Sequence, residues 1–267
     1  MRNSVGRAVG AAALLASLVG VATSGATVAA ATSMLHTNLH AAHVFNDNVS
    51  STNWGGYAVS GAPFTDAKGS WVEPTATCTS RTAQYASFWV GIDGYSSNSV
   101  EQLGTDSDCT GRGRASYYAW WEMYPQGSVA LSQSTYPVKP GDTLTAEVSV
   151  SGTTFTLSLH SSEGWTFSTQ QSGSGLSQAS AEWIAESPSL CNIFRCTLAQ
   201  LANFGTVTFT NAQAAISGGT AQPISSFTAS GGPHNITCVT SNGTTVRDSS
   251  SSLASGGAGF TTTWKHT

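Results

Sequence analysis

One glutamine and one glutamate lie in two short segments that are otherwise rich in aromatic and strand-forming residues. Gln102 falls in VGIDGYSSNSVEQLG at residues 90–104, and Glu182 falls in SAEWIAES at residues 180–187. A carboxylate can take a proton from water, and an amide can donate a hydrogen bond to the oxyanion that forms when this water attacks a carbonyl group. We therefore predict that Gln102 and Glu182 form a catalytic pair that needs neither a metal ion nor a serine nucleophile.

Alternation along a strand indicates which side chains share a face with these two groups. In SYYAWWEMY at residues 116–124, one face holds Tyr118, Trp120, Glu122 and Tyr124. A structural core seldom places a glutamate among aromatic rings, so we interpret this face as the wall of a substrate groove. In AEWIAE, Glu182 is predicted to leave its strand on the side opposite Trp183.

The elements that position these residues are predicted to be strands. Alternating segments recur at residues 86–93, 144–152, 154–161, 181–186 and 205–214, and VSVSGTTFTLSL within them is predicted to form a β-hairpin. Only the run from Cys196 to Leu201 indicates a turn of helix. Many short strands without a regular repeat predict an all-β domain built as two packed antiparallel sheets or a barrel.

The first residues of the chain are typical of a secretory signal. Arg2 and Arg7 precede or flank the apolar run AVGAAALLASLVGVA, which is shorter than the ~20 residues that cross a bilayer. We expect a signal peptide at residues 1–30, a leader at residues 31–52 that is a flexible tail or a short pro-segment, and one β-sandwich domain at residues 53–267. The mature protein is expected to be secreted, extracellular and free of the membrane.

Charge is low and slightly negative. Charged residues make up 9% of the chain against a usual ~25%, and the formal net charge is −4. Removal of the signal takes away Arg2 and Arg7, which leaves 8 basic and 14 acidic residues. Neither nucleic acid nor an anionic membrane is therefore an expected partner. Few cations are left to repel one another when carboxylates are protonated, which is compatible with life at acidic pH. We expect a monomer.

The five cysteines are interpreted through the expected export of the chain, where oxidised pairs are the rule. We predict one disulfide between Cys78 and Cys109 and a second between Cys191 and Cys196, which closes the short loop CNIFRC. Cys238 would then be free or buried, although other pairings of five cysteines remain open. No CxxC occurs and the six histidines are not spaced as ligand pairs, so we expect no metal and no cofactor.

Six motifs occur in the order found in one known family. They are NWGGY at residues 53–57, FWVGIDG at 88–94, Gln102 followed by Gly104, AWWEMYP at 119–125, SAEWIAE at 180–186 and FGTVTFTNA at 204–212. In this order the chain resembles the glutamic peptidase family, the eqolisins of peptidase G1 type. Known members are secreted acid endopeptidases of fungi with relatives in bacteria, and the short alanine-rich signal is similar to that of a bacterial member.

The resemblance implies a β-sandwich of two bent antiparallel sheets, a lectin-like jelly roll of the concanavalin A type, that hydrolyses proteins or peptides. Gln102 and Glu182 match the family's dyad: Glu182 would act as base and then as acid, and Gln102 would stabilise the oxyanion. Protonation of Glu182 would limit activity in acid. Loss of activity at neutral pH would need a second ionisation, with Asp93, Asp106, Asp108 and Glu122 as candidates. Residues implied to line or brace the groove are Trp54, Asp93, Trp120, Glu122 and Tyr124.

Two other classes of function fit the same residues. A sandwich with an aromatic concave face also suits a lectin-like protein that binds glycans or peptides without catalysis. A glycosidase could use Glu122 and Glu182 as its carboxylate pair, and the separation of the two groups in the structure would test this alternative.

Overall fold

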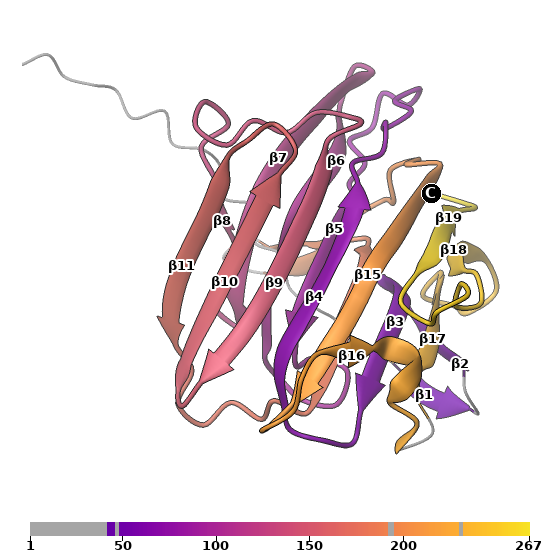
Figure 1. Ribbon diagram of the computed structural model, residues 1–267. Helices are drawn as coiled ribbons and strands as arrows, with labels where there is room; N and C mark the ends of the chain where they lie inside the picture. Colours follow the sequence, from indigo (N-terminus) through magenta and orange to yellow (C-terminus); the bar gives the residue numbers. More distant parts are fainter. Residues whose placement is uncertain (1–41, 46–47, 192–194, 230–231) are drawn as a thin grey trace, which may run out of the picture. The chain divides into compact units, whose positions relative to one another are not determined.

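The computed structural model describes residues 42–45, 48–191, 195–229 and 232–267, and nearly all of its regular structure is β-strand (Figure 1). The strands are β1 (Ala42–Phe45), β2 (Asn48–Ser51), β3 (Trp54–Ser60), β4 (Phe64–Val72), β5 (Ser87–Ile92), β6 (Val100–Thr110), β7 (Arg114–Tyr124), β8 (Val129–Ala130), β9 (Thr143–Ser151), β10 (Thr154–Ser161), β11 (Thr166–Ser172), β12 (Ser180–Glu186), β13 (Ser189–Cys191), β14 (Cys196–Leu198), β15 (Thr206–Ile216), β16 (Gln222–Pro223), β17 (His234–Val239), β18 (Val246–Ser250) and β19 (Phe260–Trp264). The described residues include one short 3₁₀-helix, η1 (Ile224–Ser226). No helix in this part of the chain is long and apolar enough to cross a membrane.

Most strands follow one another in a single hydrogen-bonded order. From one edge this order is β11, β10, β9, β4, β15, β19, β18, β17, β3, β12, β5, β6, β7 and β8, and each neighbouring pair is antiparallel. Strand β4 also contacts β5 and β12, and β10 contacts β6, without strand pairing. The order therefore folds back on itself into a β4 layer (β11, β10, β9, β4, β15) and a β12 layer (β3, β12, β5, β6, β7). Figure 1 shows β10, β9, β4 and β15 side by side. The predicted all-β sandwich is confirmed.

The two faces of the β12 layer carry different clusters of apolar side chains. The inner face places Phe88, Leu103 and Trp183 in the main core between the layers. A buried apolar side chain of this size contributes about 1.5–3 kcal/mol relative to an exposed one. The outer face carries a second cluster that consists of Trp54, Ala58, Trp89, Val100, Trp120, Ile184 and Ile236.

The alternation predicted for β7 and β12 is confirmed. Ala119 and Met123 of β7 belong to the main core, whereas Trp120 belongs to the outer cluster. In β12, Trp183 lies in the main core and Ile184 in the outer cluster, so Glu182 leaves the strand on the outer face. The outer face of the β12 layer is therefore the face that carries the predicted dyad.

Turns at one end of the β4 layer are held by polar contacts at the surface. The predicted hairpin is formed by β9 and β10, which pair from Ser151 and Thr154 onward.

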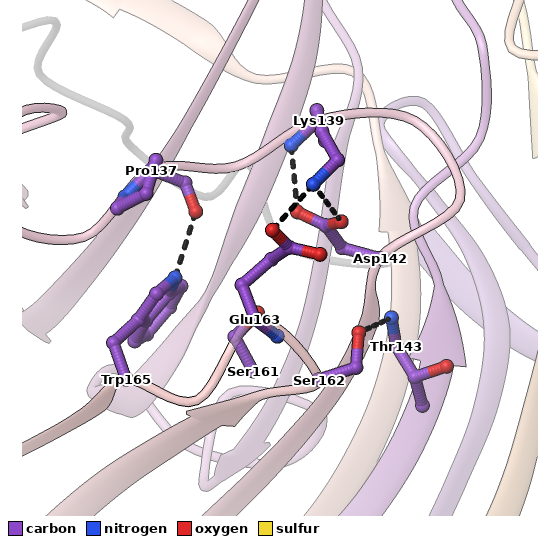
Figure 2. Close-up of polar contacts among 8 residues, drawn as sticks. All are labelled: Pro137, Lys139, Asp142, Thr143, Ser161, Ser162, Glu163 and Trp165. Carbon is purple, nitrogen blue, oxygen red and sulfur yellow. Dashed lines mark hydrogen bonds and ion pairs between the residues drawn. The ribbon is translucent and has the colours of Figure 1, made fainter.

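The turns before β9 and after β10 are joined by ion pairs of one lysine. Figure 2 shows Lys139 Nζ between two carboxylates, 3.4 Å from Asp142 Oδ1 and 2.5 Å from Glu163 Oε2. Because Lys139 and Glu163 are largely exposed, these ion pairs fix the local arrangement of the turns more than they stabilise the fold.

The disulfide prediction is confirmed, and the helix prediction is wrong. Bonds join Cys78 to Cys109 and Cys191 to Cys196, and Cys238 is a buried free thiol. The run that begins at Cys196 forms strand β14, which pairs with β13, instead of a helical turn. The disulfide between the two paired strands explains this, because Cys191 and Cys196 are themselves opposite each other in the hairpin.

The leader contributes strands at the edge of the β12 layer. Strand β2 pairs in parallel with β17, which lies beside β3, and β1 pairs with β2. The signal peptide predicted at residues 1–30 and the leader residues 31–41 lie outside the described residues.

Candidate active site

Cross-strand register brings Glu182 and Gln102 together on the outer face of the β12 layer. Glu182 in β12 is opposite Gly91 in β5, Gly91 is opposite Gln102 in β6, and Gln102 is opposite Glu122 in β7. Opposed residues of neighbouring strands point to the same face. The three polar side chains therefore form one row, in which the backbones of Glu182 and Gln102 are about 10 Å apart, two strand spacings.

Gly91 lies between the two residues in register and places no side chain there. A Cβ atom at this position would lie 3.0 Å from the ring of Trp89 and 3.1 Å from Cβ of Gln102. Both distances are shorter than ordinary van der Waals contacts. Glycine is therefore the residue that fits between Glu182 and Gln102 without displacing Trp89 or Gln102.

Gln102 is held by Glu122 in an orientation that leaves part of its amide available. Its Nε2 donates a 2.7 Å hydrogen bond to Oε2 of Glu122, and its Oε1 accepts no hydrogen bond from any described residue. An amide nitrogen carries two N–H groups. One N–H group and the carbonyl oxygen of a fully buried Gln102 therefore remain for a water molecule or a substrate.

The carboxyl group of Glu182 is fully buried and only partly hydrogen-bonded. The backbone N–H of Tyr95 donates to Oε1 at 3.4 Å, and Oε2 has no hydrogen-bond partner among the described residues. Burial raises the pKa of Glu182 well above the ordinary value of a glutamic acid. The Ser180 hydroxyl, which is close but not in hydrogen-bond geometry, and the Tyr95 N–H lower this pKa, whereas the charges of Asp93 and Glu101 raise it further.

The carboxyl group of Glu122 also favours its protonated form. Burial is the main cause that raises its pKa well above the usual range, and the nearby charges of Glu186 and Asp106 add to this effect. The hydrogen bond from Gln102 acts in the opposite direction. Glu122 therefore holds the amide of Gln102 and is itself a titratable group of the site.

Indole and phenol groups hold two further carboxylates on the same face. Trp89 Nε1 donates to Glu186 Oε2 at 2.7 Å, and Trp120 Nε1 donates to Asp106 Oδ1 at 2.6 Å. Tyr118 Oη donates to Asp106 Oδ2 at 2.7 Å. Buried carboxylates normally need such donors. The aromatic side chains of this face therefore pack together and also hold the carboxylates of Glu186 and Asp106 in place on the face that carries the predicted dyad.

The structure distributes the predicted supporting residues over two places. Trp54 and Trp120 lie in the outer cluster, Tyr124 packs against it, and Glu122 lies beside Gln102. Asp93 instead lies after β5, at a positive φ of 71°. Its carboxylate accepts hydrogen bonds from the backbone of the segment before β12, so it braces loops and does not line the aromatic face.

Two residues near Glu182 were not predicted from the sequence. Tyr95 supplies the N–H to Glu182, and its ring stacks on His234, with ring centroids 4.7 Å apart and an interplanar angle of 18°. His234 lies opposite Ala58, which lies opposite Glu182, and its Nε2 is 3.3 Å from Ser60 Oγ. Tyr95 could have been noted from its place directly after the IDG motif, but no sequence pattern links His234 to Glu182.

The carboxylate pair proposed for a glycosidase is separated by Gln102. Glu182 and Glu122 lie in strands that are three spacings apart, about 14 Å between backbones, whereas glycosidase carboxyl groups are about 5–9.5 Å apart. Gln102 lies between them in register and binds Glu122 directly. The arrangement therefore suits a glutamine–glutamate pair better than two glutamates. Among the described residues, no three His, Cys, Asp or Glu side chains are grouped as metal ligands.

Known proteins share both the sequence pattern and the fold. Residues 52–263 match the peptidase A4 family. Aspergillopepsin-2 of Aspergillus niger is 32% identical over 198 residues, which cover 65% of this chain and 67% of that protein.

Two solved structures show the same fold at lower identity. Scytalido-glutamic peptidase with a transition state analog inhibitor has a TM-score of 0.66 and 24% identity over 80% of this chain and 98% of its own. SCP-B, an eqolisin in complex with the tripeptide Ala-Ile-His, has a TM-score of 0.61 and 23% identity over the same shares. The family match spans most of the chain, so this protein belongs to the peptidase A4 family, the glutamic peptidases or eqolisins, and is a glutamic endopeptidase.

Proposed function

We propose that this protein is a secreted acid endopeptidase in which Gln102 and Glu182 form the catalytic dyad. One observation carries the proposal: the two side chains lie in register on one face, with only Gly91 between them. Each has an oxygen atom without a hydrogen-bond partner among the described residues. A water molecule and a peptide carbonyl group can be held between an amide donor and a carboxylate base in this arrangement.

In the first step, ionised Glu182 takes a proton from the attacking water as the water oxygen bonds to the peptide carbonyl carbon. Gln102 Oε1 can accept a hydrogen bond from this water, and the free N–H of Gln102 can donate to the oxyanion that forms. Glu122 fixes the amide for both tasks through its 2.7 Å hydrogen bond. A single donor to an oxyanion typically contributes about 3 kcal/mol to lowering the barrier.

In the second step, protonated Glu182 gives its proton to the leaving amine as the C–N bond breaks. The same residue thus acts as base and then as acid, which returns it to the ionised state. A raised pKa suits both parts of this cycle, because it makes the carboxylate a stronger base and keeps the proton on Glu182 until the amine accepts it.

The proposed pH range follows from two kinds of buried carboxyl group. Activity falls in acid when Glu182 is protonated, because the base is then lost. It falls at higher pH when groups that the site holds protonated become ionised. Of the four candidates named from the sequence, burial raises the pKa of both Asp108 and Glu122 well above the usual range. Ionisation of Glu122 would place a charge directly against Gln102.

Secretion and the substrate class are proposed on separate grounds. The basic and apolar segment at the N-terminus and two disulfides are typical of an exported protein. One structural neighbour is an eqolisin that binds a tripeptide, which supports protein or peptide substrates for this chain.

The test compares wild type with Glu182→Gln on a denatured protein substrate, from about pH 2 to about pH 7. A metal chelator and a serine-protease inhibitor are present throughout, and Glu163→Gln, an exposed glutamate of the β10–β11 turn, is the matched control. We expect wild type and the control to cleave in acid and Glu182→Gln to be inactive while it remains folded. Cleavage that survives in Glu182→Gln would refute the dyad, and a folded wild type that cleaves at no pH would refute the peptidase.

A further inference from the structure

Three adjoining surface pockets run along the loops that follow β3, β5 and β15 and along the segment before β12. The first, of about 510 Å³, shares Ser60 and Ala62 with a second of about 520 Å³. It shares Ser96, Ser177 and Ala179 with a third of about 440 Å³. Because each pocket has wall residues in common with the next, the three adjoin one another, and together we call them the rim groove.

The rim groove begins close to Glu182. Ala58 of β3 lies opposite Glu182, and Ser60 lies opposite Ser180, two residues further along both strands on the same face. Two residues of extended chain span about 7 Å. Tyr95, whose N–H contacts Glu182, directly precedes Ser96 in the opposite wall. A peptide bound at Glu182 in an extended form thus reaches the groove within about two residues.

The two loop walls of the rim groove are tied together by Asp93. Its Oδ2 accepts the backbone N–H of Gln178 at 2.7 Å, and its Oδ1 accepts that of Ala179 at 2.7 Å. Ser97 Oγ donates to the same Oδ1 at 3.0 Å. Asp93 is fully buried, so the loop that carries Ser96 and the segment that carries Ser177 are held in one arrangement before any substrate binds. A preformed site loses less entropy on binding.

The chemistry of the groove walls is uniform. The residues that line the three pockets are serines, threonines, glycines, alanines, two amides and a few apolar residues, and none of them carries a charge. Hydroxyl and amide groups can pair with the N–H and C=O groups of an extended peptide. A charged side chain would find no opposite charge there to offset its lost hydration.

We propose that the rim groove binds the substrate chain about two residues from the cleaved bond and selects uncharged side chains at that position. This inference rests on the proposed function, because it takes the cleaved bond to lie between Gln102 and Glu182. It adds a substrate class to that function: extended polypeptides whose residues on one side of the cleaved bond are small or neutral.

The test reverses the charge preference of one wall. In a set of matched peptides, alanine, lysine or glutamate occupies one position at a time on each side of the cleaved bond. We expect wild type to have its highest kcat/KM for alanine at the groove position. Ser177→Asp should raise the lysine-to-alanine ratio of kcat/KM at that position alone, and Ser177→Lys should lower it. Each change is expected to be about two- to five-fold, the size of an exposed charge pair. Ser168→Asp, an exposed serine on β11, is the control that should change no ratio.

The assays run near pH 5, where an introduced aspartate is ionised at its ordinary pKa of about 3.9. Unchanged ratios in both Ser177 variants, or equal changes at every position, would overturn the groove while leaving the peptidase intact. If wild type cleaves no peptide, the proposed function fails, and the groove is then judged by peptide binding to the folded protein. In that case, a peptide with lysine at the groove position that binds Ser177→Asp no better than it binds wild type would overturn the proposed role of the groove.

Discussion

At the scale of single residues, the proposed chemistry depends on whether the Glu182 carboxyl group can be ionised although its burial opposes ionisation. Burial raises the pKa of its carboxyl group, and the Ser180 hydroxyl is the largest influence that lowers it. The acid limb of kcat/KM reports the pKa of such a base in the free enzyme. We therefore expect this limb to lie above the ordinary pKa of glutamic acid, about 4.3.

Replacement of Ser180 tests this link between environment and activity. Ser180→Ala removes a group that favours the charged form, so the pKa of Glu182 rises and the acid limb moves to higher pH. Without the hydroxyl group the neutral acid is favoured further, which sets the direction of the shift. The measurement is kcat/KM across the acid range, with Ser187→Ala as the control, because Ser187 is equally buried but donates to the carbonyl of Ala199. An unchanged limb, or one at lower pH, would contradict this account of Glu182.

Tyr95 and His234 give a second prediction at this scale. The stacked rings hold the backbone N–H of Tyr95 at Glu182. His234→Ala removes the stacking and should lower kcat about five-fold, the equivalent of one aromatic contact, with a smaller change in KM. His234→Phe keeps a ring in place and should retain most of kcat. Equal losses of kcat in both variants would show that His234 acts through its imidazole nitrogens and not through its stacking on Tyr95.

At the scale of elements, the contact between β5 and its two neighbours decides the geometry of the dyad. Gly91→Ala would place a methyl group 3.1 Å from Cβ of Gln102. Overpacking of this kind costs about 1–3 kcal/mol, and here it displaces Gln102, the proposed oxyanion donor. We expect kcat to fall at least ten-fold, since positioning errors well under 1 Å are costly in catalysis.

Gly259→Ala is the matched control for Gly91→Ala. A Cβ atom there would lie 3.0 Å from the carbonyl oxygen of Phe209, a similar crowding far from Gln102 and Glu182 in sequence and outside the β12 layer. Steady-state kinetics and a thermal unfolding curve are measured for both variants. If the two lose stability alike and neither loses kcat, Gly91 is not needed to position the proposed dyad.

The elements also show what could be predicted from the sequence. Alternation is a local property of a strand, so it correctly placed Trp120 and Glu122 on one face of β7 and Glu182 opposite Trp183 in β12. Pairing between strands is not local. The sequence did not show that β5 would lie between β12 and β6, which places Gly91 between the two residues of the proposed dyad.

The helical turn predicted near Cys196 failed for a related reason. Local propensity favoured a helix, but the pairing of β13 with β14 and the bond from Cys191 to Cys196 determine the conformation there. His234 was missed because it reaches Glu182 through a strand order in which β17 joins β3. Contacts between segments far apart in the sequence decided each of these cases.

At the scale of the whole molecule, buried carboxyl groups link stability to pH. Burial raises the pKa of Glu73 to about 8, that of Glu101 to about 9 and that of Asp248 to about 8. In the unfolded chain these groups titrate near pH 4. Between these limits the folded state binds more protons than the unfolded state, so the free energy of unfolding decreases as pH rises. The stabilisation is complete below about pH 4 and is lost as pH rises through the folded-state pKa values.

We therefore expect the melting temperature to be highest in acid and to fall steadily from about pH 5 to about pH 9. Glu73→Gln should flatten this dependence, since glutamine does not titrate. Its carbonyl oxygen can accept the hydrogen bond from Trp71 Nε1, and its amide nitrogen can donate to the Ser107 hydroxyl. Glu163→Gln, an exposed site, should leave the dependence unchanged. A melting temperature that rises toward neutral pH would contradict the assignment of these carboxyl groups as protonated in the folded state.

The most direct test of the dyad is a kinetic comparison of Gln102→Ala, Glu182→Gln and the double variant at the pH of highest activity, each checked for folding by its melting temperature. Loss of the oxyanion donor should lower kcat/KM about 10²–10³-fold in Gln102→Ala. Loss of the base should lower it further in Glu182→Gln. Because the two residues act on the same water and the same oxyanion, the double variant should be about as slow as Glu182→Gln alone. Gln102→Ala with nearly wild-type kcat/KM, or losses that multiply in full in the double variant, would contradict a catalytic dyad.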